Sequence, residues 1–544
     1  MNLDVLGLIA ILLLTLALGE PLYVIMGSVA LYCLVIFGGQ GLDVLATAMI
    51  GETRGLADNP VLLAIPFFVL AGGLMTEGTI AQRLIQVARS VFGWMPGGMA
   101  VAAVSACVFF AAISGSSPVT VIAIGSIMYP ALVKEGYPDR FSNGLVTSAG
   151  SLGILIPPSI PMIVYAIVDP TRFADPPGYN LGSGEGSSGV SDLFLAGVGP
   201  GLFIAAIFAG YSVFIGLKHK TPRLPFKLSE AIHALRQGFW SLMLPVLILG
   251  GIYSGAFSPT QAAAVSVVYA FVVELWIHRS VKLEDLPRIL ADSSVLMGTL
   301  FVIMALALGF NRYLELAQIP EAAVELIKSW DLSMVSFLLI VNVLLLVVGC
   351  LMDIISAILI LVPLLSAIGF SLGVHPIHLA IIFIVNLEIG YLTPPVGLNL
   401  FVSSSIFQKK LGDVIAAVVP FIALMIGALM VITYVPTISI GPVSALKGKG
   451  FIVHFPDAEL IKKQQEEEGQ QEHQGGNELE ELMDDGEGEK KPSSGNELED
   501  LMDEVEAEQD KKPAQEAPKK KSSGNELEDL MDEVEAEQKE KKAP

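Results

Sequence analysis

Two short stretches of this chain place a double proline inside apolar sequence, close to small polar residues. They read Gly-Ile-Leu-Ile-Pro-Pro at 153–158 and Gly-Tyr-Leu-Thr-Pro-Pro at 390–395, 237 positions apart. Proline lacks a backbone donor and clashes with the preceding helical turn, so we expect a helix to break at each stretch and free its carbonyl groups. Such carbonyl oxygens, together with hydroxyl groups, can coordinate sodium.

A hairpin tip upstream of each break, Ser-Gly-Ser-Ser at 114–117 and Gly-Cys-Leu-Met-Asp at 349–353, completes a possible cation site. Cluster one joins segment 114–117 to the first break, and cluster two joins segment 349–353 to the second. The alternative is that small residues only allow close helix packing. Interrupted segments at matching positions of two halves point to a transporter's binding site, so we predict sodium ligands in both clusters. The predicted sodium-binding residues are Ser114, Ser116, Gly150, Gly153, Pro157, Gly349, Asp353, Gly390, Thr393 and Pro394.

The same places suit a carboxylate substrate. Helix breaks and hairpin tips leave backbone N–H groups at helix N-termini, which attract anions. The residues predicted to bind substrate are Ser116, Ser117, Asn143 and Asn399.

Two acids stand out in the apolar segments, where a buried carboxylate is costly and usually functional. Asp353 is predicted to bind sodium, with capping of the following helix as the alternative. Glu388 could pair with a base or lie near an aqueous face. His375 and His378 begin an apolar segment without an acidic neighbour in sequence, so we expect an interfacial position rather than a proton relay.

The elements that position these residues are apolar helices. The chain is 53% hydrophobic over 544 residues, and many apolar runs are long enough to span a bilayer. This predicts an all-α polytopic membrane protein. The expected crossings are 3–18, 22–37, 61–75, 193–215, 238–252, 262–277, 295–310 and 414–434.

Two series of segments follow the same order, which predicts two repeats. Each has an amphipathic stretch (80–94; 312–330), a pair of short apolar pieces (98–112 with 118–132; 334–349 with 354–368) and a broken segment (141–168; 377–406). Pieces of about 15 residues are short for a full crossing, so each pair is predicted to be a re-entrant helical hairpin. The predicted domains are scaffold helices 1–60, repeat one 61–168, an external loop 169–192, connecting scaffold helices 193–291, repeat two 292–406, a last transmembrane helix 407–436 and an acidic tail 437–544.

Basic residues predict the orientation in the membrane. One arrangement places 14 Lys and Arg side chains on the cytoplasmic side and only Arg54, Arg172, Arg312 and Lys328 opposite. An odd number of crossings then separates the repeats, which makes them inverted, and both termini lie outside. Residues 436–544 carry 30 acids and 14 bases, a balance of −16, whereas the preceding part has a balance of only −6.

The tail repeats Gly-Asn-Glu-Leu-Glu-(Glu/Asp)-Leu-Met-Asp from Gly476, Gly495 and Gly524. Its low hydrophobicity and high charge predict disorder, either as a solubilising tail or as a multivalent binding segment.

Sequence motifs of catalysis are missing from the chain. It has neither the Gly-x4-Gly-Lys-Ser/Thr nucleotide loop nor His-Glu-x-x-His, so we expect a transporter driven by an ion gradient rather than an enzyme. We expect no cofactor besides sodium as the coupling ion, and no nucleic-acid partner. The first apolar segment lacks a basic start, so a cleaved signal peptide is not expected.

Five motifs together closely resemble one transporter family. They are Phe-Gly-Trp-Met-Pro-Gly-Gly (92–98), Ser-Gly-Ser-Ser (114–117), Tyr-Pro-Ala-Leu (129–132), Ser-Leu-Gly-Ile-Leu-Ile-Pro-Pro-Ser (151–159) and Asn-Leu-Glu-Ile-Gly-Tyr-Leu-Thr-Pro-Pro-Val-Gly-Leu-Asn (386–399). Over residues 1–436 the chain resembles the large membrane subunit of tripartite ATP-independent periplasmic (TRAP) transporters. The long 169–192 loop and the repeated acidic tail depart from that family.

The resemblance implies an elevator-type, sodium-coupled importer of organic acids in the bacterial inner membrane, with sodium sites at the hairpin tips and helix breaks. It also implies a small four-helix membrane subunit, expected as a separate chain, and a periplasmic solute-binding protein. Two other readings stay open: a stand-alone sodium–carboxylate symporter, and a membrane scaffold that acts through its tail.

Overall fold

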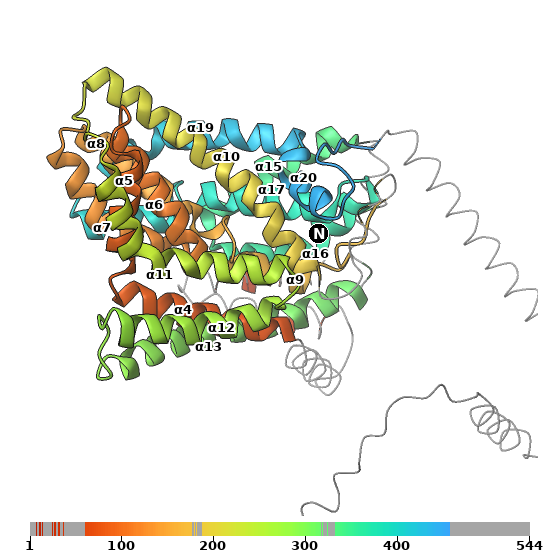
Figure 1. The fold of residues 1–544 in the computed structure, drawn as a ribbon. Helices are drawn as coiled ribbons and strands as arrows, with labels where there is room; N and C mark the ends of the chain where they lie inside the picture. The colour runs from red at the N-terminus through yellow and green to blue at the C-terminus, as the bar shows by residue number, and fades with distance from the viewer. Residues whose placement is uncertain are drawn as a thin grey trace, which may run out of the picture. The chain divides into compact units, whose positions relative to one another are not determined.

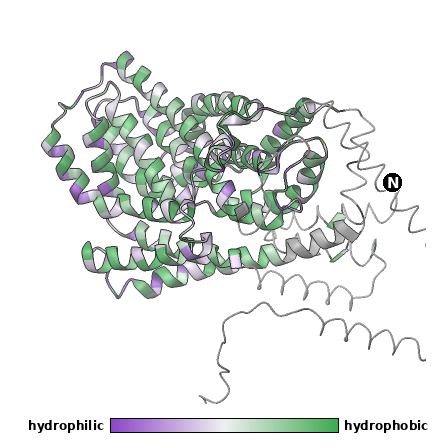
Figure 2. Cartoon of the chain, turned by 45° about the vertical axis from the view of Figure 1, so that its right-hand side comes forward, coloured by the Kyte–Doolittle hydropathy of each residue, from purple (hydrophilic) through white to green (hydrophobic). Residues whose placement is uncertain are grey.

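The computed structural model is helical in every regular element among the residues that it describes. These are 60–176, 179, 181, 188–316, 318, 324 and 332–456, with scattered positions between 7 and 36. Within them nine helices are long and apolar enough to cross a membrane, and hydrophobic residues predominate along the helices (Figure 2). The prediction of an all-α polytopic membrane protein is therefore confirmed. The predicted crossings 3–18 and 22–37 and the tail repeats lie outside the described residues.

One group of helices packs around α4, toward the bottom of Figure 1. Its members are η2 (Pro60–Leu63), α4 (Ala64–Glu77), α12 (Pro259–Val272) and α13 (Leu286–Leu316), and α11 (Leu228–Tyr253) adjoins the group through α12. α12 packs on α4 and α11, and α13 packs on the other side of α4. α13 runs through the predicted crossing 295–310 into the start of the predicted amphipathic stretch 312–330, most of which lies outside the described residues.

The first hairpin and the first break follow α4. Here lie α5 (Ile80–Phe92), α6 (Gly98–Ser114), α7 (Ser117–Lys134), α8 (Asp139–Ser151), η3 (Leu152–Ile154) and α9 (Ile160–Val168). Gly115 turns the chain between α6 and α7 with φ +59°, a left-handed conformation that glycine adopts without strain. The helical segment 139–168 is interrupted between Ile154 and Ile160, so the predicted break is present.

The second hairpin and break have the same order. They comprise α15 (Met334–Leu351), α16 (Ile354–Ser371), α17 (Pro376–Gly390) and α18 (Leu398–Phe407). Helix ends at Gly390 and resumes at Leu398, again as predicted. Both Pro–Pro peptide bonds are cis. The hairpin helices have 17, 18, 18 and 18 residues, longer than predicted, and the last three are long enough to span a bilayer. Length therefore does not support a re-entrant path, which stays a prediction.

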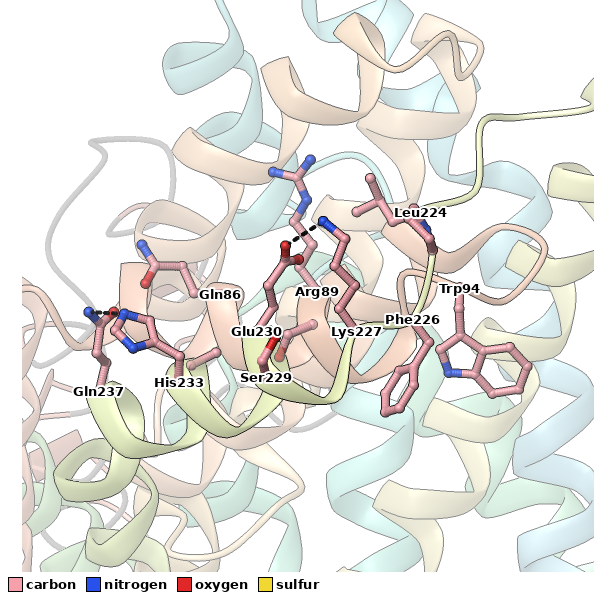
Figure 3. Close-up of a pocket in the computed structure, with 13 residues that line it drawn as sticks. Gln86, Arg89, Trp94, Leu224, Phe226, Lys227, Ser229, Glu230, His233 and Gln237 are labelled. Carbon is pink, nitrogen blue, oxygen red and sulfur yellow. Dashed lines mark hydrogen bonds and ion pairs between the residues drawn. The ribbon is translucent and has the colours of Figure 1, made fainter.

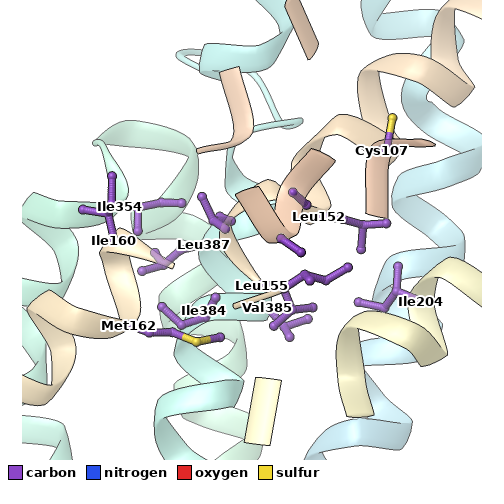
Figure 4. Packing of buried hydrophobic residues seen from close by; sticks show 14 of the residues in the cluster. Cys107, Leu152, Leu155, Ile160, Met162, Ile204, Ile354, Ile384, Val385 and Leu387 are labelled. Carbon is purple, nitrogen blue, oxygen red and sulfur yellow. The ribbon is translucent and has the colours of Figure 1, made fainter. Parts of the chain in front are cut away.

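The core gathers around α17, whose 15 residues are all buried. Ile384, Val385 and Leu387 on this helix belong to one buried cluster with Leu155 of the first break and Ile204 of α10 (Ser188–His219) (Figure 4). α19 (Leu411–Tyr434) also packs on α17. A helix that is apolar on every side belongs in the interior of a large helical protein. Residues of both broken segments thus share one hydrophobic core.

The prediction that the tail begins at 437 is wrong. Residues Thr437–Leu446 form a further helix, α20, which packs on α10 and α17 and buries Ile440 and Val443. The physical reason is composition, because charged residues are absent from 437–446. The described structure continues to residue 456.

The prediction that His375 has no acidic neighbour is also wrong. His375 is fully buried, and its Nε2 lies 3.1 Å from the Asp175 carboxylate in the 169–192 loop. His378 is buried too, between the Ser439 hydroxyl and the Thr433 carbonyl. Both imidazoles are buried in the helical packing, where Ile377 N donates to His375 Nδ1 and the other ring nitrogens have partners far away in sequence.

Candidate functional site

The first hairpin tip lies directly against the first break. A Cβ at Gly115 would stand 2.7 Å from the Pro158 carbonyl oxygen, and one at Gly153 would stand 2.5 Å from the Ser116 carbonyl oxygen. No larger side chain fits at either glycine without displacing backbone. The structure therefore brings the two parts of cluster one together.

Hydroxyl groups complete cluster one. Ser114 Oγ lies 3.0 Å from Thr120 Oγ1, and Thr120 Oγ1 donates to the Ser116 carbonyl at 2.8 Å. Thr120 was not among the predicted residues. Its spacing from Ser116, one helical turn into α7, was the signal that could have identified it.

Cluster two has the same construction. A Cβ on Gly390 would overlap the Gly349 backbone, so tip and break touch at two glycines. Val396 N donates to the Cys350 carbonyl at 3.1 Å, and Thr393 Oγ1 donates to the Ile389 carbonyl at 2.8 Å. Pro394 is exposed, whereas Pro157 of the first break is buried.

Asp353 caps α16. Its carboxylate accepts hydrogen bonds from Ile355 N (3.1 Å), Ser356 N (3.2 Å) and Ser356 Oγ (2.5 Å), and the residue is exposed. This is the alternative weighed against sodium ligation. A carboxylate has more acceptor positions than these three donors use, so capping leaves room for a cation.

The donor groups in both clusters fit a hard monovalent cation. Each cluster offers backbone carbonyls at a helix break together with hydroxyl oxygens, the donor set of sodium sites in broken helices. Ser114, Ser116, Gly153 and Pro157 would supply the first site, and Gly349, Gly390, Thr393 and Pro394 the second.

The four predicted substrate residues separate into three places. Ser117 Oγ accepts a 2.6 Å hydrogen bond from Asn399 Nδ2, and both residues are fully buried. Asn143 lies elsewhere on α8, where its Oδ1 accepts from Thr147, whose hydroxyl also contacts Ser403 of α18. Ser117 with Asn399, and Thr147 with Ser403, join the two halves of the protein. Ser116 lines a crevice.

That crevice, of about 230 Å³, lies between the first hairpin tip and the helices around α4. Ser114, Ser116 and Ile160 line one wall, and α4 and α13 form the other with Thr76, Glu77, Asp292 and Ser293. Glu77 pairs with Arg288 at 2.9 Å. The N-termini of α7 and α9, at Ser117 and Ile160, both begin at this crevice.

Glu388 bonds to the opposite break rather than to a base. Its Oε1 lies 2.7 Å from Ser151 Oγ, and Ser151 Oγ lies equally close to the Ser148 carbonyl oxygen. Glu388 Oε2 is buried and has no hydrogen-bond partner. A serine hydroxyl has one proton, so the Ser148 carbonyl and the Glu388 carboxyl compete for it or share it.

Comparisons with known proteins agree with this architecture. Residues 9–438 match the family model of the tripartite ATP-independent periplasmic transporter, DctM component. The chain is 44% identical over 385 residues to a C4-dicarboxylate TRAP transporter large permease protein of Pseudomonas aeruginosa, covering 71% of this chain and 86% of that relative. It is 39% identical over 435 residues to the corresponding protein of Rhodobacter capsulatus, covering 80% and 97%.

A solved structure has a similar fold. The transporter YdaH of Alcanivorax borkumensis superposes with a TM-score of 0.54 at 15% identity, covering 76% of this chain and 90% of that one. The family match and the curated relatives agree with the prediction of a transport subunit rather than an enzyme, located in the inner membrane with several crossings. The chain belongs to the DctM family, the large permease component of tripartite ATP-independent periplasmic transporters.

Proposed function

We propose that this subunit imports an organic acid coupled to sodium, after a periplasmic solute-binding protein delivers the substrate and together with a small four-helix membrane subunit. The observation that carries the proposal is the pairing of each hairpin tip with a helix break, which produces two groups of oxygen donors. Two relatives are named as C4-dicarboxylate permeases, which supports a carboxylate as the substrate class.

The crevice supports binding of a carboxylate beside cluster one. Two helix N-termini begin there, and the positive end of each helix dipole favours an anion. Arg288 offsets the negative charge of Glu77 on the opposite wall. A carboxylate next to Ser116 would thus share an oxygen-rich region with a sodium ion, and each would favour binding of the other.

An elevator movement would displace the hairpins and breaks along the group around α4. The crevice divides these two parts of the described structure, and its α4 wall contains small residues, Gly72 and Gly73, that allow close sliding contact. Figure 1 shows α4, α12 and α13 together on one side and α6, α7 and α8 on another.

Transport in proteoliposomes tests the coupling. The full chain, its small subunit and its binding protein should accumulate labelled carboxylate when an inward sodium gradient is imposed, and should give background uptake with potassium instead. Ser114→Ala should weaken the sodium dependence, because it removes a hydroxyl of cluster one. Equal uptake with either cation would refute sodium coupling but leave the family assignment intact.

A further inference from the structure

An open cleft of about 650 Å³ lies between α5 and the start of α11, away from both clusters (Figure 3). The cleft is built from elements that hold each other in place. Arg83 Nη1 donates to the Gln237 carbonyl at 3.0 Å, and Leu224 N donates to the Gly93 carbonyl at 3.0 Å. A cleft of this size accommodates a ligand of several hundred daltons.

Two basic side chains line the cleft, and each forms an exposed ion pair with a glutamate. Arg89 contacts Glu135 at 3.0 Å, and Lys227 contacts Glu230 at 2.8 Å. Their side chains remain 45% and 57% exposed. Exposed ion pairs stabilise a protein little, so both cations can turn toward an anion in the cleft. Arginine and lysine side chains are the usual partners of phosphate.

The other side of the cleft is apolar. Trp94 and Phe226 lie next to each other there (Figure 3), and Leu224 adjoins them. These side chains are 52%, 54% and 39% exposed. Large aromatic residues with an apolar body are typical of the zone between lipid head groups and acyl chains. The cleft therefore combines a cationic part with an aromatic part, which matches an amphiphile.

The sequence around the cleft is basic, which favours an anionic ligand. Between residues 218 and 237 the chain carries five Lys and Arg residues and one acid. The positive-inside distribution assigns this loop to the cytoplasmic surface. Beyond the cleft, α11 continues with exposed apolar side chains, among them Phe239, Trp240 and Val246, along which acyl chains can lie. Basic pockets beside membrane helices on this side bind anionic lipid head groups.

We propose that this cleft binds an anionic phospholipid of the cytoplasmic leaflet. The phosphate lies between Arg89 and Lys227, and the part of the acyl chains nearest the head group packs on Trp94 and Phe226. The site lies outside the clusters and the crevice, so it is independent of the coupling ion and of the substrate.

Quenching of Trp94 fluorescence tests the proposal. The full chain, with Trp240, Trp276 and Trp330 replaced by Phe, is placed in phosphatidylcholine nanodiscs containing a small fraction of phosphatidylglycerol with brominated acyl chains. Brominated phosphatidylglycerol should quench Trp94 more than brominated phosphatidylcholine at the same fraction. Arg89→Gln with Lys227→Gln should lower the relative affinity for the anionic lipid on the order of tenfold, since both basic residues contribute to the attraction for an anionic lipid surface.

Matched variants and competitors separate the other outcomes. Arg279→Gln with Lys282→Gln removes two exposed charges from the same predicted side, away from the cleft, and should leave the quenching unchanged. Arg89→Lys with Lys227→Arg keeps both positive charges and should retain the preferential quenching by phosphatidylglycerol. A loss in the Gln variant alone is then due to the missing charges. Equal quenching by both lipids would mean ordinary lipid contact and overturn the proposal. Relief by inorganic phosphate would assign the site to a free anion, and loss of quenching on adding the small subunit would assign the cleft to that partner; either result overturns a lipid site.

Discussion

Ser151 links the two breaks through a single hydroxyl. Its neighbours are the Glu388 carboxyl on α17 and the Ser148 carbonyl on α8, both at 2.7 Å. A buried polar group left without a partner destabilises a protein more than the loss of both partners does. Single residues of this kind therefore determine whether the two halves of the core stay together.

Substitutions at Ser151 and Glu388 should show this coupling in thermal unfolding of the purified chain. Glu388→Gln should be close to wild type, because its amide can donate to Ser151 as a protonated carboxyl does. Glu388→Leu and Ser151→Ala should each lower the unfolding free energy by about 1–3 kcal/mol. The double variant should lose less than the sum of the two. Additive losses would mean that the 2.7 Å contact contributes nothing.

Asp353 can be tested with a pair of variants that separates capping from ion binding. Asparagine is as good an N-cap as aspartate, so Asp353→Asn should keep the stability of α16, whereas Asp353→Ala should lose about 1 kcal/mol. If Asp353 also binds sodium, both variants need more sodium for half-maximal uptake. A wild-type sodium requirement in Asp353→Asn would leave Asp353 as a cap alone.

At the scale of elements, each site depends on a helix that stops and a hairpin that turns. The breaks occur where Pro157-Pro158 and Pro394-Pro395 stand, and the tips fit into them at Gly115 and Gly390. The interruption exposes carbonyl groups, and the glycines let the tip come close enough to share them.

Removal of a break should abolish transport without unfolding the protein. Pro157→Ala with Pro158→Ala lets α8 continue, since each interior proline opposes a helix by about 3 kcal/mol. Uptake should fall to background while the melting temperature is retained or rises. Pro130→Ala, at an exposed proline inside α7, is the control and should keep uptake. Preserved uptake in the double variant would contradict the role of the first break.

Close contact at the second tip can be tested by adding one methyl group. Gly390→Ala places a Cβ onto the Gly349 backbone, so the tip must move away from the break. We expect lower thermal stability and a higher sodium requirement in uptake. Gly427→Ala, on α19 with open space around it, should be neutral or slightly stabilising. Normal sodium dependence in Gly390→Ala would show that cluster two needs no tip contact.

At the scale of the whole molecule, the charge of −22 is concentrated in the tail. The tail starts later than the predicted boundary at 437, because α20 packs on α10 and α17. A deletion that tests the tail must therefore begin after residue 456.

Deletion of 457–544 should leave uptake unchanged, whereas deletion of 437–544 should destabilise the protein by exposing the surface that Ile440 and Val443 cover. The charge distribution also predicts a periplasmic tail. A cysteine at Ser494 should then react with an impermeant maleimide in intact spheroplasts. Labelling only after lysis would place the tail in the cytoplasm and reverse the predicted orientation of the last helix. Loss of uptake on deletion of 457–544 would favour the scaffold function.

The sequence by itself determined the helical membrane class, the two breaks and the residues at both tips, because hydropathy and double prolines act locally. Long apolar runs form helices wherever they lie, and prolines interrupt them in any packing. The pairing of each tip with its break was also predictable, since each pair belongs to one half of the chain, whereas Thr120 of cluster one was not predicted.

Only the tertiary structure decided which groups meet between the halves. Ser151 with Glu388, Ser117 with Asn399 and His375 with Asp175 are pairs at sequence separations of 237, 282 and 200. Local patterns do not encode such partners, because they result from how whole helices pack. The same holds for the late start of the tail and for the cleft beside α5. The role of a charged or polar residue depends on which partner groups the fold places next to it.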